Sequence, residues 1–116
     1  RVNMAMESIN LARKVREILS EKKGENVVIM DVSKLSSVTD YFVLVSGMNA
    51  PHLKALANEV ERTLKKEEVR CAHRSGVLDS HWVVLDYLDV VVHIFLPEVR
   101  EYYSLERLWK DAPLVD

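Results

Sequence analysis

Trp82-Val-Val-Leu-Asp-Tyr-Leu-Asp-Val-Val-Val-His-Ile-Phe95 is the stretch that decides the fold of this 116-residue chain. Two runs of β-branched and aromatic residues flank a short polar interruption, which is typical of a β-hairpin. The interruption predicts a tight turn with Tyr87 and Leu88 at its tip. The pairs that a two-residue turn places opposite each other are Asp86 and Asp89, Val84 and Val91, and Trp82 and His93.

The alternation of side chains sorts this hairpin into two surfaces. One surface is purely apolar and carries Val83, Leu85, Val90 and Val92, so we expect it to be core. The other carries Trp82, Val84, Val91 and His93 and is rimmed by Asp86 and Asp89. It is too apolar for a solvated surface and too polar for a dry interior, so we predict that it docks a partner. Leu88 is an unusual tip residue, because Leu at a positive φ is strained by about 1–2 kcal/mol.

The composition is that of one folded domain. Apolar residues make up 48% of the chain and charged residues 29%, and the length fits a single compact unit. The net charge of −2 argues against a protein whose main function is to bind nucleic acid, because such domains carry an excess of basic residues. We therefore expect no direct nucleic-acid specificity, whereas a basic protein partner is compatible with this charge.

Cys71 is the single cysteine, so no intramolecular disulfide can form and a four-cysteine zinc site is excluded. A reducing compartment fits this usage. No apolar run approaches the roughly 18–20 residues that span a bilayer, and no secretory or transit peptide is evident. We expect a cytoplasmic protein with no membrane association, bacterial in the first place, with an organellar homologue as the alternative.

Periodic patterns along the chain predict the remaining elements. An amphipathic helix covers 6–23, and Gly24 follows it as a left-handed cap. Nearly continuous apolar runs at 26–32 and 41–46 predict central strands that are covered on both faces. A second helix begins after Asn49 as N-cap and Pro51 in the first turn. An edge strand is expected over 67–73.

The C-terminal part begins a last helical region at Pro97. Tyr102, Leu105 and Trp109 recur at helical spacing and are expected to anchor it. Residues 1–5 and 111–116 are expected to be loose ends of a single domain that spans 1–116. The order of elements predicts an α/β (α+β) fold: a mixed sheet of about five strands with helices packed on it.

Residues that could act in catalysis or bind a metal do not form a recognisable catalytic or metal-binding motif. Asp86, Asp89 and Asp31 could be metal carboxylates, but no Gly-rich loop follows to hold phosphates. The spacing of Cys71 and the histidines matches no zinc pattern. We therefore expect no enzyme, no catalytic residue, no metal and no cofactor.

Four segments in order along the chain resemble the ribosomal silencing factor, or Iojap-like, family. These segments are Asp31-Val-Ser33; Thr39-Asp-Tyr-Phe-Val-Leu-Val-Ser-Gly47 with His52 opening the next helix; Trp82 to Phe95; and Arg100-Glu-Tyr-Tyr-Ser-Leu-Glu-Arg-Leu-Trp109. Each is modest alone, and together they are highly specific. The family usually has Gly where this chain has Leu88.

The resemblance implies a domain shaped like a nucleotidyltransferase without the active site. It also implies translation repression under nutrient limitation, by binding large-subunit ribosomal protein fourteen and sterically blocking the joining of the ribosomal subunits. The expected contact residues are Trp82, Asp86, Tyr87, Leu88, Asp89, His93, Glu98, Arg100 and Tyr103. The alternatives are a nucleotidyltransferase-like enzyme and a self-associating structural module. A homodimer would not exclude the silencing role.

Overall fold

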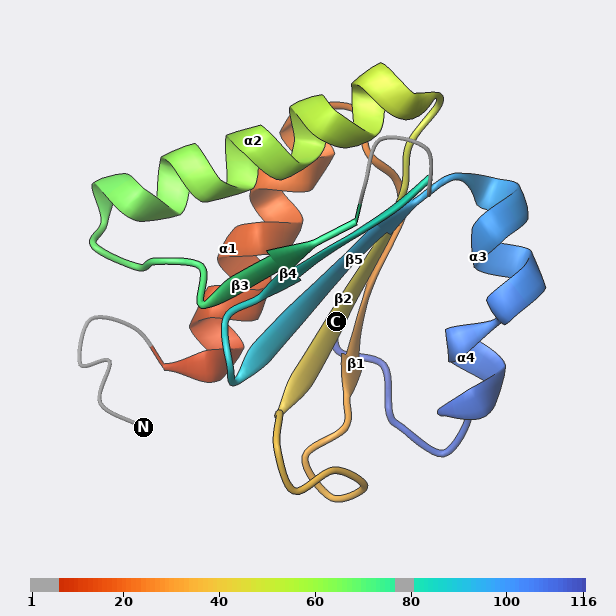
Figure 1. The fold of residues 1–116 in the computed structure, drawn as a ribbon. Coiled ribbons are helices and arrows are strands. Elements are labelled where there is room, and N and C mark those ends of the chain that lie inside the picture. Colours follow the sequence, from red (N-terminus) through yellow and green to blue (C-terminus); the bar gives the residue numbers. More distant parts are fainter. Residues whose placement is uncertain (1–6, 77–80) are drawn as a thin grey trace.

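The computed structural model describes residues 7–76 and 81–116, and its strands lie side by side in one sheet (Figure 1). The elements are α1 (Ser8–Glu21), β1 (Glu25–Asp31), β2 (Tyr41–Ser46), α2 (Ala50–Lys66), β3 (His73–Ser75), β4 (Trp82–Asp86), β5 (Val90–Phe95), α3 (Pro97–Tyr103) and α4 (Leu105–Leu108). The five strands have the order β1-β2-β5-β4-β3. β2 and β5 run parallel, whereas the β1–β2, β4–β5 and β3–β4 pairs are antiparallel. The prediction of a mixed sheet in an α+β domain is confirmed.

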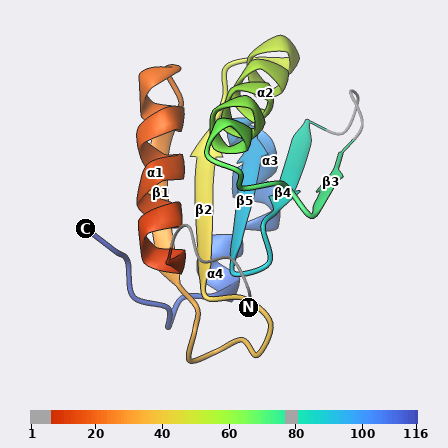
Figure 2. The ribbon, with the colours of Figure 1, turned by 90° about the vertical axis from the view of Figure 1, so that its left-hand side faces the viewer.

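Helices cover the two faces of the sheet unequally. α1 and α2 lie on one face, and the short helices α3 and α4 lie on the other (Figures 1 and 2). The larger core lies under α1 and α2 and includes Val43 and Val45, whereas Leu44 belongs to a smaller core on the α3 side. β2 is therefore covered on both faces, as its continuous apolar run predicts. The apolar face of the hairpin, with Val83, Leu85, Val90 and Val92, is buried in the larger core, as expected.

Both long helices end in a left-handed residue that is not glycine. After α1, Lys23 has φ 69°, and Gly24 donates its N–H to the Leu19 carbonyl at 2.8 Å. This is a Schellman ending with Lys23 in the left-handed position, so the prediction that Gly24 takes it is wrong. Gly24 is required for space, because a Cβ there would lie 2.6 Å from Cγ2 of Val45.

The edge strand begins later than the sequence suggests. Glu68 has φ 64°, and Val69 donates its N–H to the Leu64 carbonyl at 2.9 Å. The Schellman ending of α2 therefore uses the residues that were expected to start the strand over 67–73. Val69 then points into the larger core. The strand that pairs with β4 is His73–Ser75, at the outer edge of the sheet.

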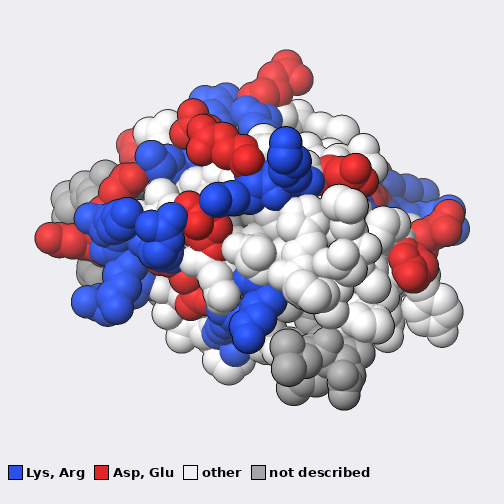
Figure 3. All heavy atoms as spheres, turned by 90° about the horizontal axis from the view of Figure 1, so that it is seen from above, with Lys and Arg blue, Asp and Glu red and all other residues white. Residues whose placement is uncertain are grey.

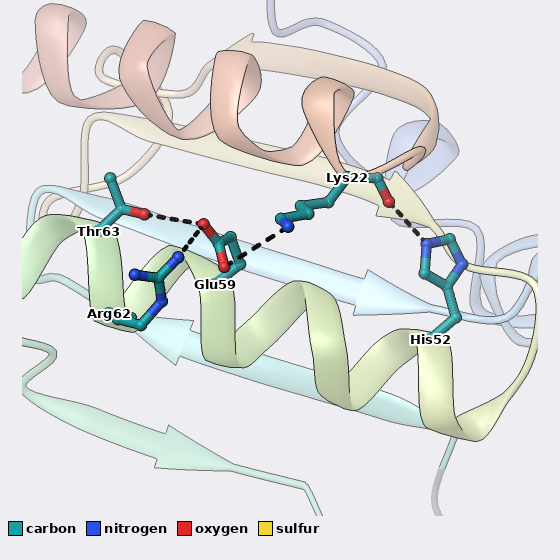
Figure 4. Close-up of polar contacts among 5 residues, drawn as sticks. All are labelled: Lys22, His52, Glu59, Arg62 and Thr63. Atoms are coloured by element: carbon teal, nitrogen blue, oxygen red, sulfur yellow. Dashed lines mark hydrogen bonds and ion pairs between the residues drawn. The ribbon is translucent and has the colours of Figure 1, made fainter.

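The polar junction between α1 and α2 is centred on His52 and Glu59 (Figure 4). Asn49 caps α2 by accepting the His52 N–H at 2.9 Å, as predicted. The His52 ring accepts the Met48 N–H at Nδ1, so its Nε2 carries the proton that faces the Lys22 carbonyl at 2.9 Å. Further along α2, Glu59 contacts Arg62, Thr63 and Lys22. These contacts fix the end of α1 against the start of α2.

The outer face of this helical layer carries charges of both signs. Lysine and arginine side chains alternate with aspartate and glutamate on the face shown in Figure 3, and no basic stripe runs across it. Nucleic-acid-binding domains concentrate basic residues in such a stripe. Within residues 7–76 and 81–116, no helix combines the length and apolar character needed to cross a bilayer.

The C-terminal residues are part of the sheet rather than a loose end. Asp31 donates its N–H to the Pro113 carbonyl at 2.8 Å, and Val115 donates to the Ile29 carbonyl at 2.9 Å. Arg16 also donates to the Val115 carbonyl at 3.2 Å. Residues 112–115 therefore cover the free edge of β1, which satisfies backbone groups that an exposed edge would leave open. Residues 1–5, the other expected loose end, lie outside the described residues.

Candidate partner-binding surface

The hairpin turn is displaced from its expected place. Tyr87 donates its N–H to the Val90 carbonyl at 2.9 Å, so Leu88 and Asp89 form the tip instead of Tyr87 and Leu88. The strand pairs are Trp82 with Phe95, Val84 with His93 and Asp86 with Val91. The predicted pairs are therefore wrong by two residues. A shift by an even number leaves every side chain on its predicted face, because side chains alternate with period two.

Leu88 is held in the conformation that makes this turn possible. Its φ is 73°, and Asp89 donates its N–H to the Tyr87 carbonyl at 2.9 Å across it. This hydrogen bond closes a γ-turn, a strained conformation for a residue with a Cβ. The Leu88 N–H is satisfied by the Asp86 carboxylate at 2.7 Å, and the Leu88 side chain is 64% exposed.

We expect Leu88→Gly to raise the free energy of unfolding by about 0.5–1 kcal/mol. Glycine removes about 1–2 kcal/mol of backbone strain. Part of this gain is lost, because glycine also raises the conformational entropy of the unfolded chain. Urea denaturation followed by circular dichroism measures the change. Leu88→Ala is the matched control, since it removes the same exposed side chain but keeps the Cβ. Equal stability of the glycine and alanine variants would show that the turn is unstrained.

Tyr87 is not a surface residue. Its side chain is only 6% exposed and belongs to the larger core. Burial raises the pKa of its hydroxyl, and that oxygen has no hydrogen-bond partner among residues 7–76 and 81–116. Tyr87, which was expected at the hairpin tip as a contact residue, can therefore offer a partner very little surface.

His93 lies on the second face of the hairpin, where neighbouring aromatic side chains cover part of it. Trp82 donates its indole N–H to Nδ1 of His93 at 3.2 Å, and the Phe42 ring meets the imidazole edge-on at 5.2 Å. Burial lowers the pKa of His93 to about 4. His93 is thus a neutral acceptor that holds the Trp82 ring in place.

Trp82 forms the floor of a groove between β4 and α3. The groove has a volume of about 670 Å³ and is lined by Ser75, Gly76, Trp82, Val84, Glu98, Val99, Tyr102 and Tyr103. The Tyr103 ring lies 4.8 Å from the Trp82 ring and 5.0 Å from the Tyr102 ring, measured between centroids. Because α3 covers the sheet only in part, three aromatic side chains remain accessible here. Aromatic anchors with a polar rim are the composition of a protein interface.

Arg100, in contrast, is turned away from solvent. It is 9% exposed and bonded to Ser46 and Glu106. A side chain in this position supports the groove from behind and has little surface to offer a partner.

The two acidic residues of the hairpin lie at the other end of β4. Asp86, beside the turn, and Asp89, at the tip, are both half-buried. The Asp89 carbonyl accepts the N–H groups of Asp40 and Tyr41 at 2.9 and 3.1 Å, which fixes the tip against the β1–β2 loop. The expected contact residues therefore divide into a groove group (Trp82, Glu98 and Tyr103), a tip group (Asp86, Leu88 and Asp89), two buried residues (Tyr87 and Arg100) and the half-buried His93.

Sequence reasoning missed several groove residues. Val99 was not considered, and Tyr102 was expected to anchor α3, yet its side chain is strongly exposed. Ser104, with φ 50°, ends α3 and changes the direction of the chain, so the periodic spacing from Tyr102 to Trp109 does not describe one helix. The available signal was the run Glu98, Val99, Tyr102 and Tyr103, whose spacing of one, three and four places them near one another on a helix.

Potential metal ligands do not gather in the described part of the chain. No group of three or more His, Cys, Asp or Glu side chains is placed to hold an ion among residues 7–76 and 81–116. The Cys71 thiol faces the backbone carbonyl of His73 at 3.2 Å, and burial raises its pKa.

Comparison with known proteins extends this description. Residues 5–116 match the family model described as "Ribosomal silencing factor during starvation". The chain is 35% identical over 96 residues to the ribosomal silencing factor of Bacillus subtilis, covering 83% of this chain and 81% of that protein. It is 38% identical over 104 residues to that of Chromobacterium violaceum, covering 90% and 85%.

Solved structures are similar as well. A crystal structure of a Chromobacterium violaceum protein superposes with a TM-score of 0.87 at 37% identity and covers 90% of this chain and 88% of that one. A crystal structure of a Bacillus halodurans protein gives a TM-score of 0.76 at 30% identity, with 93% and 95% covered. Chloroplastic Iojap of Arabidopsis thaliana is 26% identical over 110 residues, which are 95% of this chain and 46% of that protein.

Proposed function

The chain belongs to the ribosomal silencing factor family, whose name places it in ribosome-associated regulation of translation, and on that premise we propose a specific mechanism of silencing. The protein binds large-subunit ribosomal protein fourteen and prevents the large and small subunits from joining, so that translation falls when nutrients are scarce. It acts as a steric block and not as an enzyme.

The groove between β4 and α3 is the observation that carries this proposal. Its three aromatic side chains, Trp82, Tyr102 and Tyr103, are accessible and face one cavity of about 670 Å³. Residues of this kind dominate binding energy when a partner desolvates them. The hairpin tip, with Asp86, Leu88 and Asp89, is a second contact at the far end of β4.

The charge of the proposed interface suits a basic partner. Glu98 is the one charged residue among those that line the groove in the described part of the chain, and Asp86 and Asp89 add negative charge at the tip. A lysine or arginine side chain of the ribosomal protein can pair with Glu98 while stacking on the aromatic rings. Acidic rims of this kind raise association rates toward basic surfaces.

The size of the domain is sufficient for steric exclusion. Its extents are 35 × 33 × 23 Å, which is far more than the layer of water that separates two docked surfaces. A large subunit that carries it on the joining face cannot approach the small subunit closely. No chemical step is needed for this effect.

We expect Tyr103→Ala to weaken binding to purified large subunits about 30-fold, or about 2 kcal/mol, without unfolding the domain. Tyr103 is 50% exposed, so its loss removes an interface anchor and little core. Trp82→Ala is a poorer test, because Trp82 also packs against Phe95 and bonds His93. Cosedimentation with large subunits, and pull-down of isolated ribosomal protein fourteen, measure the change.

The control for this experiment is Leu114→Ala. Leu114 is also an exposed apolar residue, but it pairs with Met30 beside β1, and β2 and β5 lie between that edge of the sheet and β4. It should bind like the unmodified protein. Unchanged binding by Tyr103→Ala would remove the groove from the interface, and failure of the unmodified protein to bind would refute the proposed mechanism.

A further inference from the structure

Arg100 connects parts of the chain that are distant in sequence. From α3, its Nη1 donates to Oγ of Ser46 at the end of β2, at 2.9 Å. Its Nε and Nη2 donate to the two carboxylate oxygens of Glu106 in α4, at 3.1 and 2.9 Å. The guanidinium carbon lies 5.9 Å from the centre of the Phe95 ring. One buried side chain therefore ties α3 and α4 to each other and both to the sheet.

The corner that this side chain spans is a strained turn. Ser104 is the last cap of α3 and the first cap of α4, has φ 50° and makes no side-chain capping bond with the described residues. A residue with a Cβ in this region is strained by about 1–2 kcal/mol. The relative position of the two helices depends on their packing against the smaller core and on contacts that cross the corner, and the paired hydrogen bonds between Arg100 and Glu106 are such a contact.

The wall of the groove directly precedes the corner. Tyr102 and Tyr103 are the last two residues before Ser104, and the Tyr103 ring reaches the Trp82 ring at 4.8 Å. A rotation of the chain at Ser104 would move this ring relative to Trp82. The shape of the groove is thus coupled to the pair of hydrogen bonds between Arg100 and Glu106.

We infer that the Arg100–Glu106 pair is a latch that holds the groove in its binding-competent shape. Glu106 does not line the groove, so it acts through Arg100 and is a positioning residue. This inference rests on the proposed function, because it concerns the same docking site. Glu106 is the accessible half of the latch, with its side chain 43% exposed, whereas that of Arg100 is 10% exposed.

A positioning role has a kinetic consequence that a contact residue does not share. When only a fraction of the molecules has a competent groove, the apparent dissociation constant rises by the inverse of that fraction. The association rate falls in proportion, whereas the dissociation rate of the formed complex stays the same. Loss of a direct contact acts mainly on dissociation instead.

Glu106→Gln is the variant that tests the latch. We expect about tenfold weaker binding to purified bacterial large subunits, entirely through slower association. Hydrogen exchange of residues 97–109, measured on the protein alone, should be faster than in the unmodified protein. Glu101→Gln is the matched control, because it removes the same charge from an exposed position on α3 and should change neither rate nor exchange.

Arg100→Lys provides a second variant, since it keeps the positive charge but loses the paired hydrogen bonds. It should reproduce the slower association of Glu106→Gln, and the double variant should be little worse than either alone. Unchanged affinity of Glu106→Gln, or a weaker affinity that arises from faster dissociation, would overturn the latch. Should the unmodified protein fail to bind large subunits, the proposed function fails. The latch is then judged by exchange alone, supported by faster exchange in Glu106→Gln and refuted by unchanged exchange.

Discussion

Replacing Tyr87 with alanine is expected to lower the free energy of unfolding by about 3–5 kcal/mol, the range for deleting a buried aromatic ring. The ring lies in the larger core under α2, close to Cys71, and is almost completely buried. A loss of this size is a large fraction of the 5–15 kcal/mol of a typical domain. Urea denaturation monitored by circular dichroism measures it.

Tyr87→Phe is the matched control for the ring. The hydroxyl is buried and has no hydrogen-bond partner in the described part of the chain, so its removal should leave stability unchanged or raise it by up to about 1 kcal/mol. Comparing the two variants separates the contribution of the ring to the free energy of unfolding from that of the hydroxyl. A loss below about 1 kcal/mol in Tyr87→Ala would mean that the residue lies at an exposed hairpin tip in solution.

The second large effect is expected from acid, through His93. Burial lowers its pKa from 6.5 to about 4, so between these two values the unfolded chain binds the proton and the folded chain does not. The stability that depends on neutral His93 is complete above pH 6.5, falls as the pH drops and is lost below pH 4. The full shift is worth about 3 kcal/mol.

The structure supplies the reason for this shift. Phe42 and Phe95 pack beside the ring, so a charge there would lose its hydration. Protonation at Nδ1 would also break the hydrogen bond from Trp82. Both effects favour the neutral form in the folded protein.

His93→Gln tests this link, because glutamine can accept the Trp82 bond but does not titrate. The unmodified protein should lose about 2 kcal/mol more than the variant between pH 7 and pH 4.5, measured by urea denaturation at each pH. Asp31 contributes to acid loss in both proteins, since hydrogen bonds from Ser33 lower its pKa, and it cancels in the comparison. Parallel pH profiles of the two proteins would contradict a buried neutral His93.

Local patterns predicted the hairpin and the other long elements. The apolar runs at β1 and β2, the amphipathic spacing of α1 and α2 and the cap at Asn49 all appear in the structure within a few residues of where they were expected. These features depend on side chains that are neighbours along the chain. The two hairpin faces were also assigned correctly, because strand alternation depends only on residue parity.

The hairpin register illustrates where such reasoning stops. A two-residue turn was expected at Tyr87-Leu88, yet it forms at Leu88-Asp89, with Leu88 strained. The shift puts Tyr87 next to Val90 in the strand pairing and inside the core, where its burial outweighs a strain of about 1–2 kcal/mol. The choice depends on a pocket formed by other elements, which no local pattern contains.

The candidate site shows the same division. Aromatic and acidic residues near the hairpin were recognised from the sequence as interface material, and the family resemblance named most of them. Their sorting into groove, tip and interior came only from the fold, because exposure depends on how far α3 covers the sheet. Arg100 is the clearest case, since an arginine on a short helix is usually exposed, yet here it is buried between Ser46 and Glu106.

By itself, the sequence determined the fold class, the family and the two faces of the hairpin, since each is carried by local periodicity or by motifs along the chain. Tertiary structure alone decided which residues are available to a partner. Burial results from contacts between elements that are distant in sequence, such as Tyr87 with the core under α2 and Tyr103 with Trp82. Those contacts exist only after the helices have packed on the two faces of the sheet.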